Sequence, residues 1–237
     1  MKRVETREFY EAGYALADPA EAARMGRWRA IGARSKGTHV RTLLGRAGLA
    51  PRTIVEIGCG DGSLLVELSA LATVDGFELS ANAAAHARNR NVARKVEAFD
   101  GEHLPAGDDE YDLAVLSHVL EHVPDPEPLL WEAARVARHV IVEVPLEDNR
   151  SARRPAKQRL SRDAGHLHQF DRAAVLRLLK GMTVLGELTD PLPYEHHAFF
   201  AGPAKGAAKT AARTVLHRAG LAERLFTVHY AVLARRV

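Results

Sequence analysis

One glycine-rich segment stands between a β-branched run and a helix-like run, and it reads Glu56-Ile57-Gly58-Cys59-Gly60-Asp61-Gly62-Ser63. Glycine at three alternate positions allows a tight turn and lets a ligand approach the main chain closely. Amide N–H groups at the start of the following helix would face that ligand. The spacing is G-x-G-x-G, whereas dinucleotide-binding loops have G-x-G-x-x-G. The carboxylate of Glu56 would repel a pyrophosphate but would attract a ligand with ammonium and sulfonium charges.

Acidic residues also end the next two predicted strands. Glu78 ends the second strand, where a carboxylate can hold a ribose diol through two charge-assisted hydrogen bonds. Asp100 ends the third strand and can reach an adenine amino group. Any one of these carboxylates could be a solvated charge at a strand end. Acidic residues at three successive strand ends are more specific, and they predict a nucleoside-binding edge.

A sheet must hold these strand ends together, and the pattern from Arg52 onward predicts one. Short β-branched runs alternate with Ala/Leu-rich helical runs, which implies parallel βαβ units around a covered sheet. The predicted strands are 53–57, 73–79, 95–99, 112–117, 140–144, 183–188 and 228–233. The predicted helices are 8–17, 19–33, 38–47, 63–71, 81–90, 125–137 and 171–181, followed by a helical region at 207–225.

Composition limits the class of protein. The chain has 237 residues, 46% of them apolar and 27% charged, which fits one α/β domain with an elaborated end. Cys59 is the single cysteine, so an intramolecular disulfide is excluded and a reducing cytoplasm is expected. The sequence shows no signal peptide and no apolar run near the ~18 residues of a membrane span. A net charge of +3 is too small to indicate nucleic-acid binding by itself.

The segment 53–145 resembles the type 11 family of class I methyltransferases, which use S-adenosylmethionine (SAM). Residues 55–62 look like the first motif of class I methyltransferases, and residues 76–80 look like the second. The runs 100–105 and 111–126 are similar to the type 11 family, with weaker similarity as far as Leu179. The resemblance implies an α/β fold, a Rossmann-like, mostly parallel seven-stranded sheet with helices on both faces and an antiparallel last strand.

The resemblance also implies a layout for the chain and its cofactor. Residues 1–50 would form an N-terminal helical cap, and residues 51–237 a SAM-binding domain with an acceptor-covering insertion at about 146–170. The Pro-Gly-Gly turn usual before the fifth strand is absent, and Arg138-His139 stands there instead. The predicted SAM contacts are Glu56, Gly58, Cys59, Gly60, Gly62, Glu78, Leu79, Asp100, Gly101 and Ser117.

Two histidines are candidate catalytic residues. Methyl transfer from a sulfonium is an in-line displacement, and it needs a base only when the acceptor must lose a proton. His118 follows the fourth strand, and His166 lies beyond the fifth strand, where the acceptor is expected. A histidine with an ordinary pKa near about 6.5 can take a proton at neutral pH. Either histidine could instead order its loop.

A metal site is an alternative interpretation of the same histidines. Small-RNA 2′-O-methyltransferases and ubiquinone-pathway O-methyltransferases resemble this chain in a Glu-x-x-Glu-His segment that, with a later histidine, holds a divalent metal. The corresponding residues here are His118, Glu121, His122 and His166, with His118 in place of the first glutamate. The other interpretation is a polar lock that ties the loop to the next helix.

Two basic clusters bear on the acceptor. If they cover the acceptor site, an anionic acceptor is expected, such as a carboxylate, a phosphorylated metabolite or a nucleotide-linked sugar. They could equally be solvated helix faces. Trp28, Tyr10 and Tyr14 could form an aromatic wall, and His196-His197, in a proline-rich loop, could border the pocket. The clusters are Arg24, Arg27, Arg29, Arg34 and Lys36, and then Arg150, Arg153, Arg154, Lys157, Arg159 and Arg162.

These observations favour a cytoplasmic SAM-dependent methyltransferase that acts on a small molecule, at oxygen rather than nitrogen or carbon. An RNA-binding methyltransferase or a non-catalytic SAM-binding module is the alternative. The aromatic content of 6% and the lack of an RNA-binding appendage argue against it. A nicotinamide-dependent reductase is disfavoured by the glycine spacing and by the absence of a Tyr-x-x-x-Lys motif.

Overall fold

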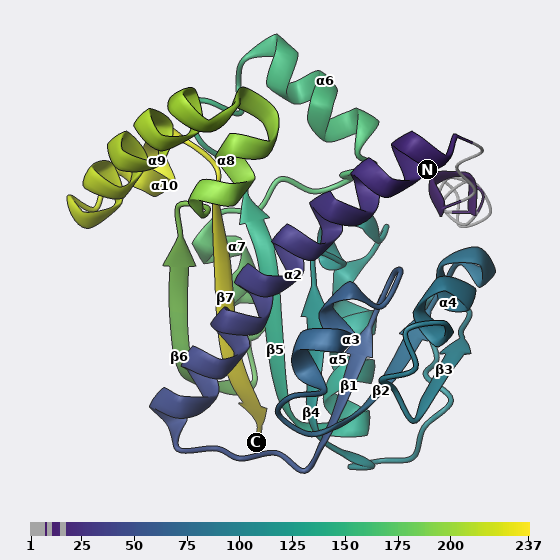
Figure 1. Ribbon diagram of the computed structural model, residues 1–237. Coiled ribbons are helices and arrows are strands. Elements are labelled where there is room, and N and C mark those ends of the chain that lie inside the picture. Colours follow the sequence, from purple (N-terminus) through teal and green to yellow (C-terminus); the bar gives the residue numbers. More distant parts are fainter. Residues whose placement is uncertain (1–7, 9–10, 15–17) are drawn as a thin grey trace.

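The centre of the molecule is a seven-stranded sheet in the order β3-β2-β1-β4-β5-β7-β6 (Figure 1). The computed structural model describes residues 8, 11–14 and 18–237. Strand β7 pairs antiparallel with both β5 and β6, and the other pairs are parallel. The predicted Rossmann-like sheet with an antiparallel last strand is confirmed. The strands are β1 (Thr53–Ile57), β2 (Thr73–Glu78), β3 (Lys95–Ala98), β4 (Tyr111–Ser117), β5 (Ala137–Leu146), β6 (Met182–Asp190) and β7 (Val228–Arg236).

Helices cover both faces of the sheet. Side chains alternate across a strand, so Ile54 packs in the layer under one set of helices and Val55 in the layer under the other. Figure 1 shows α2 and α3 in front of the sheet. The first layer includes residues of α2 (Pro19–Ala47), α3 (Ser63–Leu68) and α4 (Ala81–Arg88), and the second includes residues of α5 (Pro126–Val136) and α7 (Arg172–Leu178).

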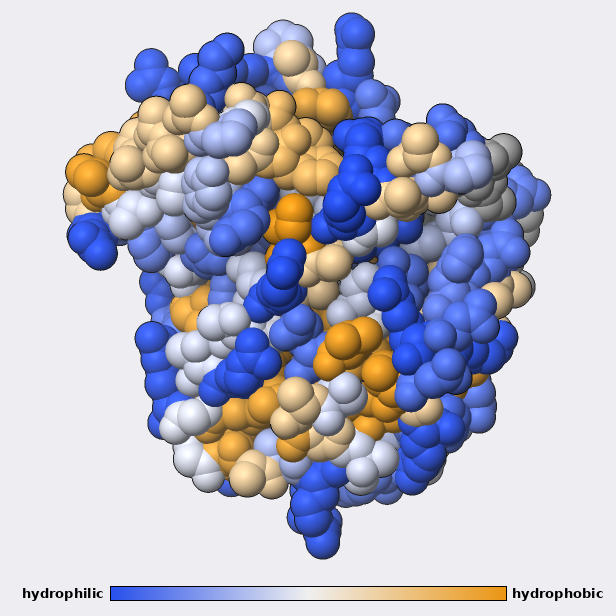
Figure 2. All heavy atoms as spheres, viewed as in Figure 1, coloured by the Kyte–Doolittle hydropathy of each residue, from blue (hydrophilic) through white to orange (hydrophobic). Residues whose placement is uncertain are grey.

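Several helices gather beyond the carboxyl ends of β5 and β6, at the top of Figure 1. They are α6 (Pro155–Asp163), α8 (Tyr194–Ala201), α9 (Pro203–Arg218) and α10 (Ala222–Leu225), and a short 3-10 helix, Leu120–His122, follows β4. Apolar side chains gather on the surface over α8 and α9 (Figure 2). Because α8 contains His196 and His197, the prediction that they lie in a proline-rich loop is wrong. None of the helices that the structure describes is long and apolar enough to cross a membrane.

The prediction of separate helices at 19–33 and 38–47 is wrong, because α2 runs unbroken from Pro19 to Ala47. Gly37 lies between the two predicted helices, and it allows α2 to approach α3. A Cβ on Gly37 would lie 2.7 Å from the Cβ of Glu67. The predicted ends are confirmed: the Asp18 side chain caps the first turn, and Gly48 ends the helix with φ 64°. Of the predicted helix 8–17, residues 8 and 11–14 are helical and the rest lie outside the described residues.

The chain passes from α5 into β5 without a turn. Val136 is the last helical residue and Ala137 is the first residue of the strand, with φ −140° and ψ 145°. No turn is formed between α5 and β5, so a Pro-Gly-Gly sequence is not needed here, and Arg138-His139 lies within β5.

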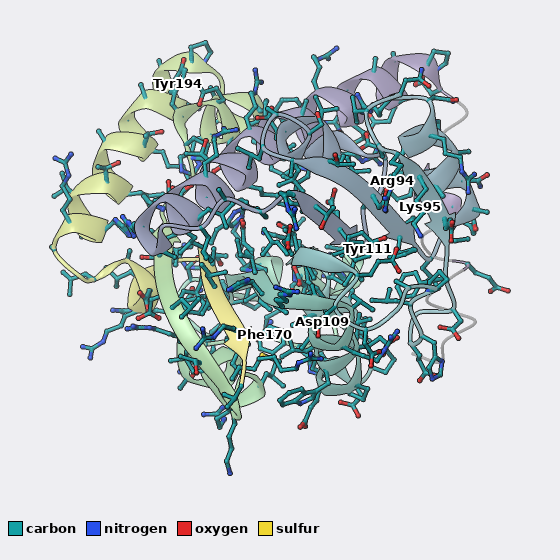
Figure 3. All side chains as sticks on the ribbon, turned by 90° about the horizontal axis from the view of Figure 1, so that it is seen from below. Arg94, Lys95, Asp109, Tyr111, Phe170 and Tyr194 are labelled. Carbon is teal, nitrogen blue, oxygen red and sulfur yellow. The ribbon has the colours of Figure 1, made fainter. Side chains whose placement is uncertain are left out.

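A buried carboxylate ties three strands together away from the helices at the top. Asp75 of β2 accepts hydrogen bonds from the Tyr111 hydroxyl at 2.8 Å and from the Arg94 Nε at 3.1 Å. Figure 3 shows Arg94, Lys95 and Tyr111 near one another on this side of the molecule. Since Lys95 begins β3 and Tyr111 begins β4, the cluster fixes the amino-terminal ends of these strands around β2.

Candidate active site

A cavity of about 350 Å³ lies at the carboxyl ends of β1, β2 and β4, and is called the first cavity below. The parallel pairing of these strands brings the predicted residues of all three to one edge. Gly62 and Asp100, which were also predicted to contact the cofactor, are not on its wall. The predicted residues on the wall are Glu56, Gly58, Cys59, Gly60, Glu78, Leu79, Gly101 and Ser117.

The glycine loop has a left-handed backbone at three alternate positions, with φ 73° at Gly58, 55° at Gly60 and 75° at Gly62. Residues that carry a Cβ rarely adopt this left-handed backbone conformation. Space is also short, because a Cβ on Gly58 would lie 2.6 Å from Val119. A Cβ on Gly62 would lie 2.9 Å from the Cα of Ala87 in α4. Gly62 is therefore required for helix packing, whereas Gly58 and Gly60 shape the cavity wall.

Glu78 links the end of β2 to this loop. One of its carboxylate oxygens accepts the Gly60 amide at 2.7 Å, and the other accepts the Ser80 amide at 2.9 Å. Burial raises the pKa of Glu78, and these amide hydrogen bonds partly oppose that rise. Glu78 therefore stands where the sequence predicted it, beside the glycine loop.

Two other polar groups on this wall need a partner. Within the described part of the chain, neither Glu56 Oε2 nor Ser117 Oγ has a hydrogen-bond partner, although both atoms are buried. Burial raises the pKa of Glu56 well above its usual range, and the charge of Lys36 opposes this. Buried polar atoms are nearly always hydrogen-bonded in folded proteins. A ligand with an ammonium group and hydroxyls would satisfy both atoms, so the wall fits SAM.

Asp100 does not face the first cavity. Its side chain is exposed and accepts hydrogen bonds from the amides of Glu102, at 2.8 Å, and His103, at 2.7 Å. The neighbouring Phe99 and Gly101 do line the cavity. A carboxylate after a strand can hold its own loop instead of a ligand, and the sequence does not distinguish these two uses.

A second cavity, of about 940 Å³, lies beside the first. It is bordered by residues of α6, α8 and α9. The two cavities adjoin. Their walls share Tyr14, Trp28, Arg29, His118, His122, His196 and His229.

The second cavity is basic. Of the predicted basic clusters, Arg29, Arg154 and Lys157 are on its wall, and α9 adds Lys209 and Arg213. Burial and the charges of Arg213 and Lys157 lower the pKa of Lys209, and burial lowers the pKa of Arg213 to about 10. Among the described residues, none accepts a hydrogen bond from the buried Arg213 Nε. Lys209 and Arg213 were missed because single basic residues on a C-terminal helix carry no motif.

His166 and Glu147 form a pair on the wall of the second cavity. His166 Nδ1 lies 2.8 Å from Glu147 Oε2, which also accepts the Ser161 hydroxyl at 2.7 Å. Burial lowers the pKa of His166, but the hydrogen bond to Glu147 and the charges of Glu147 and Glu121 together outweigh it, so the net shift is upward. The pair therefore stabilises a protonated imidazole.

The four residues predicted as a metal site fall into two groups. Glu121, His122 and His166 have candidate ligand atoms within 4.8 Å of one another. His118 belongs to another group, with Glu143 and His229. Glu143 and His229 were missed because they lie on β5 and β7, far from His118 in the sequence. Burial lowers the pKa of His118 well below its usual range and that of His122 to about 4.

Comparisons with known proteins find methyltransferases among the similar sequences and structures. The chain is 37% identical over 107 residues to a ubiquinone biosynthesis O-methyltransferase from Cupriavidus pinatubonensis. That alignment covers 41% of this chain and 43% of the relative, so the chain spans under half of the relative's length.

Solved structures share the fold. A SAM-dependent methyltransferase from Thermotoga maritima matches with a TM-score of 0.65 and 20% identity, over 98% of this chain and 100% of that one. Geranyl diphosphate C-methyltransferase from Streptomyces coelicolor, solved with Mg²⁺, geranyl diphosphate and S-adenosylhomocysteine, matches with a TM-score of 0.65 and 16% identity, over 99% and 97%. A family model described as a methyltransferase domain matches residues 27–182. The chain therefore belongs to this family of methyltransferase domains, which confirms the predicted resemblance to SAM-dependent class I enzymes.

Proposed function

We propose that this chain transfers a methyl group from SAM to a small anionic acceptor, at oxygen in preference to nitrogen or carbon. The observation that carries the proposal is the adjoining pair of cavities. One has a glycine loop and a strand-end carboxylate, and the other has several basic side chains. Bound SAM would supply a methyl group on a sulfonium, and an aligned acceptor oxygen would attack the methyl carbon in line with S-adenosylhomocysteine as the leaving group.

The first cavity binds the cofactor. Glu78 hydrogen-bonds the ribose hydroxyls, and Glu56 and Ser117 take the polar groups that their buried atoms lack. Gly58 and Gly60 let the ligand approach the main chain, beside Cys59 and Leu79. Asp100 acts through its loop, because it holds the amides beside Gly101 rather than the ligand.

The second cavity binds the acceptor. Lys157, Lys209 and Arg213 come from two helices and neutralise its anionic group. Trp28, Leu192 and Phe226 give the same cavity apolar surface for the rest of the molecule. Repulsion among the cations costs free energy in the empty protein, and an anion removes that cost.

His166 is the proposed base. Its pair with Glu147 orients the ring and stabilises the imidazolium that forms when an acceptor hydroxyl gives up its proton. His118 is less suited to this role, because its nitrogens face Glu121 at 3.3 Å and Glu143 at 3.7 Å. His118 instead forms part of the wall that the two cavities share.

Two segments cover the cavities in this proposal. The N-terminal cap, residues 1–50, contributes Trp28 and Arg29, and the insertion at about 146–170 contributes Lys157 through α6. Excluding water from both cavities favours transfer to the acceptor over hydrolysis.

A cytoplasmic location would keep the thiol of Cys59 reduced, consistent with its place on the cofactor wall.

Calorimetric titration with S-adenosylhomocysteine, beside NADH as a control, tests the cofactor assignment. Incubation with SAM and a panel of hydroxylated carboxylates and phosphate esters, each beside its neutral analogue, tests the acceptor class by mass spectrometry. Methylation confined to anionic members is expected. Binding of NADH in preference to S-adenosylhomocysteine would overturn the first assignment. Methylation of neutral analogues alone, or a salt-dependent complex with RNA as the methylated species, would overturn the second.

A further inference from the structure

A buried cluster of two histidines and one glutamate lies beneath the border of the two cavities. His118 follows β4, Glu143 is on β5 and His229 is on β7, so three neighbouring strands bring them together. His229 Nδ1 lies 3.2 Å from Glu143 Oε1, and His118 Nε2 lies 3.7 Å from the same oxygen. All three candidate ligand atoms lie within 4.8 Å of one another.

These three atoms share a second property. Each of them, His118 Nε2, Glu143 Oε1 and His229 Nδ1, is buried and lacks a hydrogen bond of acceptable geometry within the residues that the structure describes. The Glu143 side chain is 1% exposed. Leaving three polar atoms unsatisfied at one point is costly unless something binds them together. A cation held at about 2.1 Å from each donor would require donor atoms about 3–3.5 Å apart. The two distances from Glu143 Oε1 to the histidine nitrogens, 3.2 Å and 3.7 Å, are close to that range.

The groups around the cluster hold the donors in place. The other oxygen of Glu143 lies 3.3 Å from His39 Nδ1, and the opposite nitrogen of His39 lies 2.9 Å from Asp190. The other nitrogen of His118 lies 3.3 Å from Glu121 Oε1. Histidine ligands in metalloproteins usually have such a carboxylate on the second ring nitrogen, which fixes the ring and the tautomer.

The backbone of His118 is also specialised. Its φ of 58° is in the left-handed region, which costs about 1–3 kcal/mol for a residue other than glycine. The His118 amide donates to the Glu143 carbonyl at 2.8 Å, which holds the ring next to the Glu143 side chain. Such a conformation is retained where the surrounding structure enforces it, often at functional sites.

We propose that His118, Glu143 and His229 bind a divalent transition-metal ion. Imidazole and carboxylate donors suit zinc, iron, manganese and cobalt, and two histidines with one carboxylate leave coordination positions open. His118 and His229 line both cavities, so the open positions face the place where donor and acceptor meet. There the ion binds an oxygen of the acceptor. That last role rests on the proposed function, whereas metal binding itself does not.

The second group of candidate ligands gives the matched controls. Glu121, His122 and His166 also converge, but none of them belongs to the cluster of His118, Glu143 and His229. One ring nitrogen of each histidine has its own partner: His166 Nδ1 lies 2.8 Å from Glu147, and His122 Nδ1 lies 3.2 Å from the Gly165 carbonyl. His122→Gln and His166→Gln therefore remove a histidine near the site without removing a proposed ligand.

The experiment titrates the full chain, after treatment with a chelator and dialysis, with Co²⁺ followed by visible absorption and then with Zn²⁺ in competition. One ion per chain is expected. His118→Asn, Glu143→Gln and His229→Gln should weaken Co²⁺ binding by at least about tenfold, the lower end of the loss seen when even outer partners of metal ligands are removed. His122→Gln and His166→Gln should leave the affinity unchanged. Asparagine is chosen at position 118 because it tolerates the left-handed backbone.

Thermal unfolding and S-adenosylhomocysteine titration show whether each variant is folded. If Glu143→Gln unfolds, the decision rests on His229→Gln, whose side chain is 12% exposed. No Co²⁺ or Zn²⁺ binding by folded wild-type protein would overturn the proposal, as would a loss confined to the two control variants. Because these readouts need no methyl transfer, a failed metal site is distinguishable from a failed cofactor assignment, which would abolish S-adenosylhomocysteine binding.

Discussion

Glu78 at the end of β2 accepts a 2.7 Å hydrogen bond from the amide of Gly60 in the loop that follows β1. Glu78 as a residue is 6% exposed, and the left-handed backbone of Gly60 (φ 55°) lies within reach of its carboxylate. One side chain thus organises the loop and forms part of the cavity wall, and removing it would affect both.

Replacing Glu78 with alanine should weaken S-adenosylhomocysteine binding by about 1.5–3 kcal/mol, or roughly ten- to a hundredfold, because charge-assisted hydrogen bonds are lost. Calorimetric titration measures this. Glu97→Ala is the control, since that carboxylate lies on β3 and is off the cavity wall. Equal affinity of wild type and Glu78→Ala would contradict our placement of the cofactor.

Tyr111→Phe should lower the free energy of unfolding by about 1–3 kcal/mol, because the buried Asp75 loses its 2.8 Å hydroxyl donor. Urea unfolding measures the change. Tyr194→Phe is the control, since Tyr194 is 41% exposed on α8, away from Tyr111 in Figure 3. S-adenosylhomocysteine affinity should stay the same, because Tyr111 lines neither cavity. A stability loss no larger than that of the control would mean that Arg94 and the Lys95 amide satisfy Asp75 without the hydroxyl.

The sequence predicts well where local chemistry and the chain's periodicity agree. The strand bounds at 53–57 match β1, and Glu78 stands at the end of β2 as predicted. Both follow from short-range patterns: alternating apolar residues, glycines that tolerate positive φ, and a carboxylate at a strand end. The number of strands and the antiparallel last strand then follow from the family resemblance rather than from any single strand.

Long-range contacts are what the sequence did not predict. Glycine has a low intrinsic helix propensity, yet Gly37 lies within α2. It is favoured there because Glu67 of α3 comes so close that a Cβ would not fit. The surroundings of His118 depend on Glu143 and His229, which are brought together only when β7 inserts beside β5. The role of Asp100 depends on which amides lie nearest to it, and those belong to its own loop.

Lys209→Ala should weaken the binding of an anion by roughly ten- to a hundredfold, because one charge-assisted contact is worth about 1.5–3 kcal/mol. Inorganic pyrophosphate is a suitable calorimetric probe, since it carries only the anionic chemistry proposed for the acceptor. Lys205→Ala is the control, because Lys205 is on the same helix but off the cavity wall. Equal losses of pyrophosphate affinity in the two variants would mean that the effect comes from general surface charge, and would contradict an anion site at Lys209.

Glu147→Gln should lower the pKa of His166, because the substitution removes the carboxylate charge that helps to raise it while burial still lowers it. Titration of the His166 ring protons by NMR measures this shift.

Since the folded pKa of His166 is raised and that of Glu147 is lowered, the pair adds stability between about pH 4.3 and 6.5, where both are charged. That contribution is lost as pH rises through the folded pKa of His166, and also as pH falls through that of Glu147. Wild type and variant should therefore differ most in unfolding free energy between about pH 4.3 and 6.5 and converge at alkaline pH. If His166 is the base, the acid limb of kcat/KM should move to lower pH in the variant, and an unmoved limb with a shifted NMR pKa would remove His166 from the reaction.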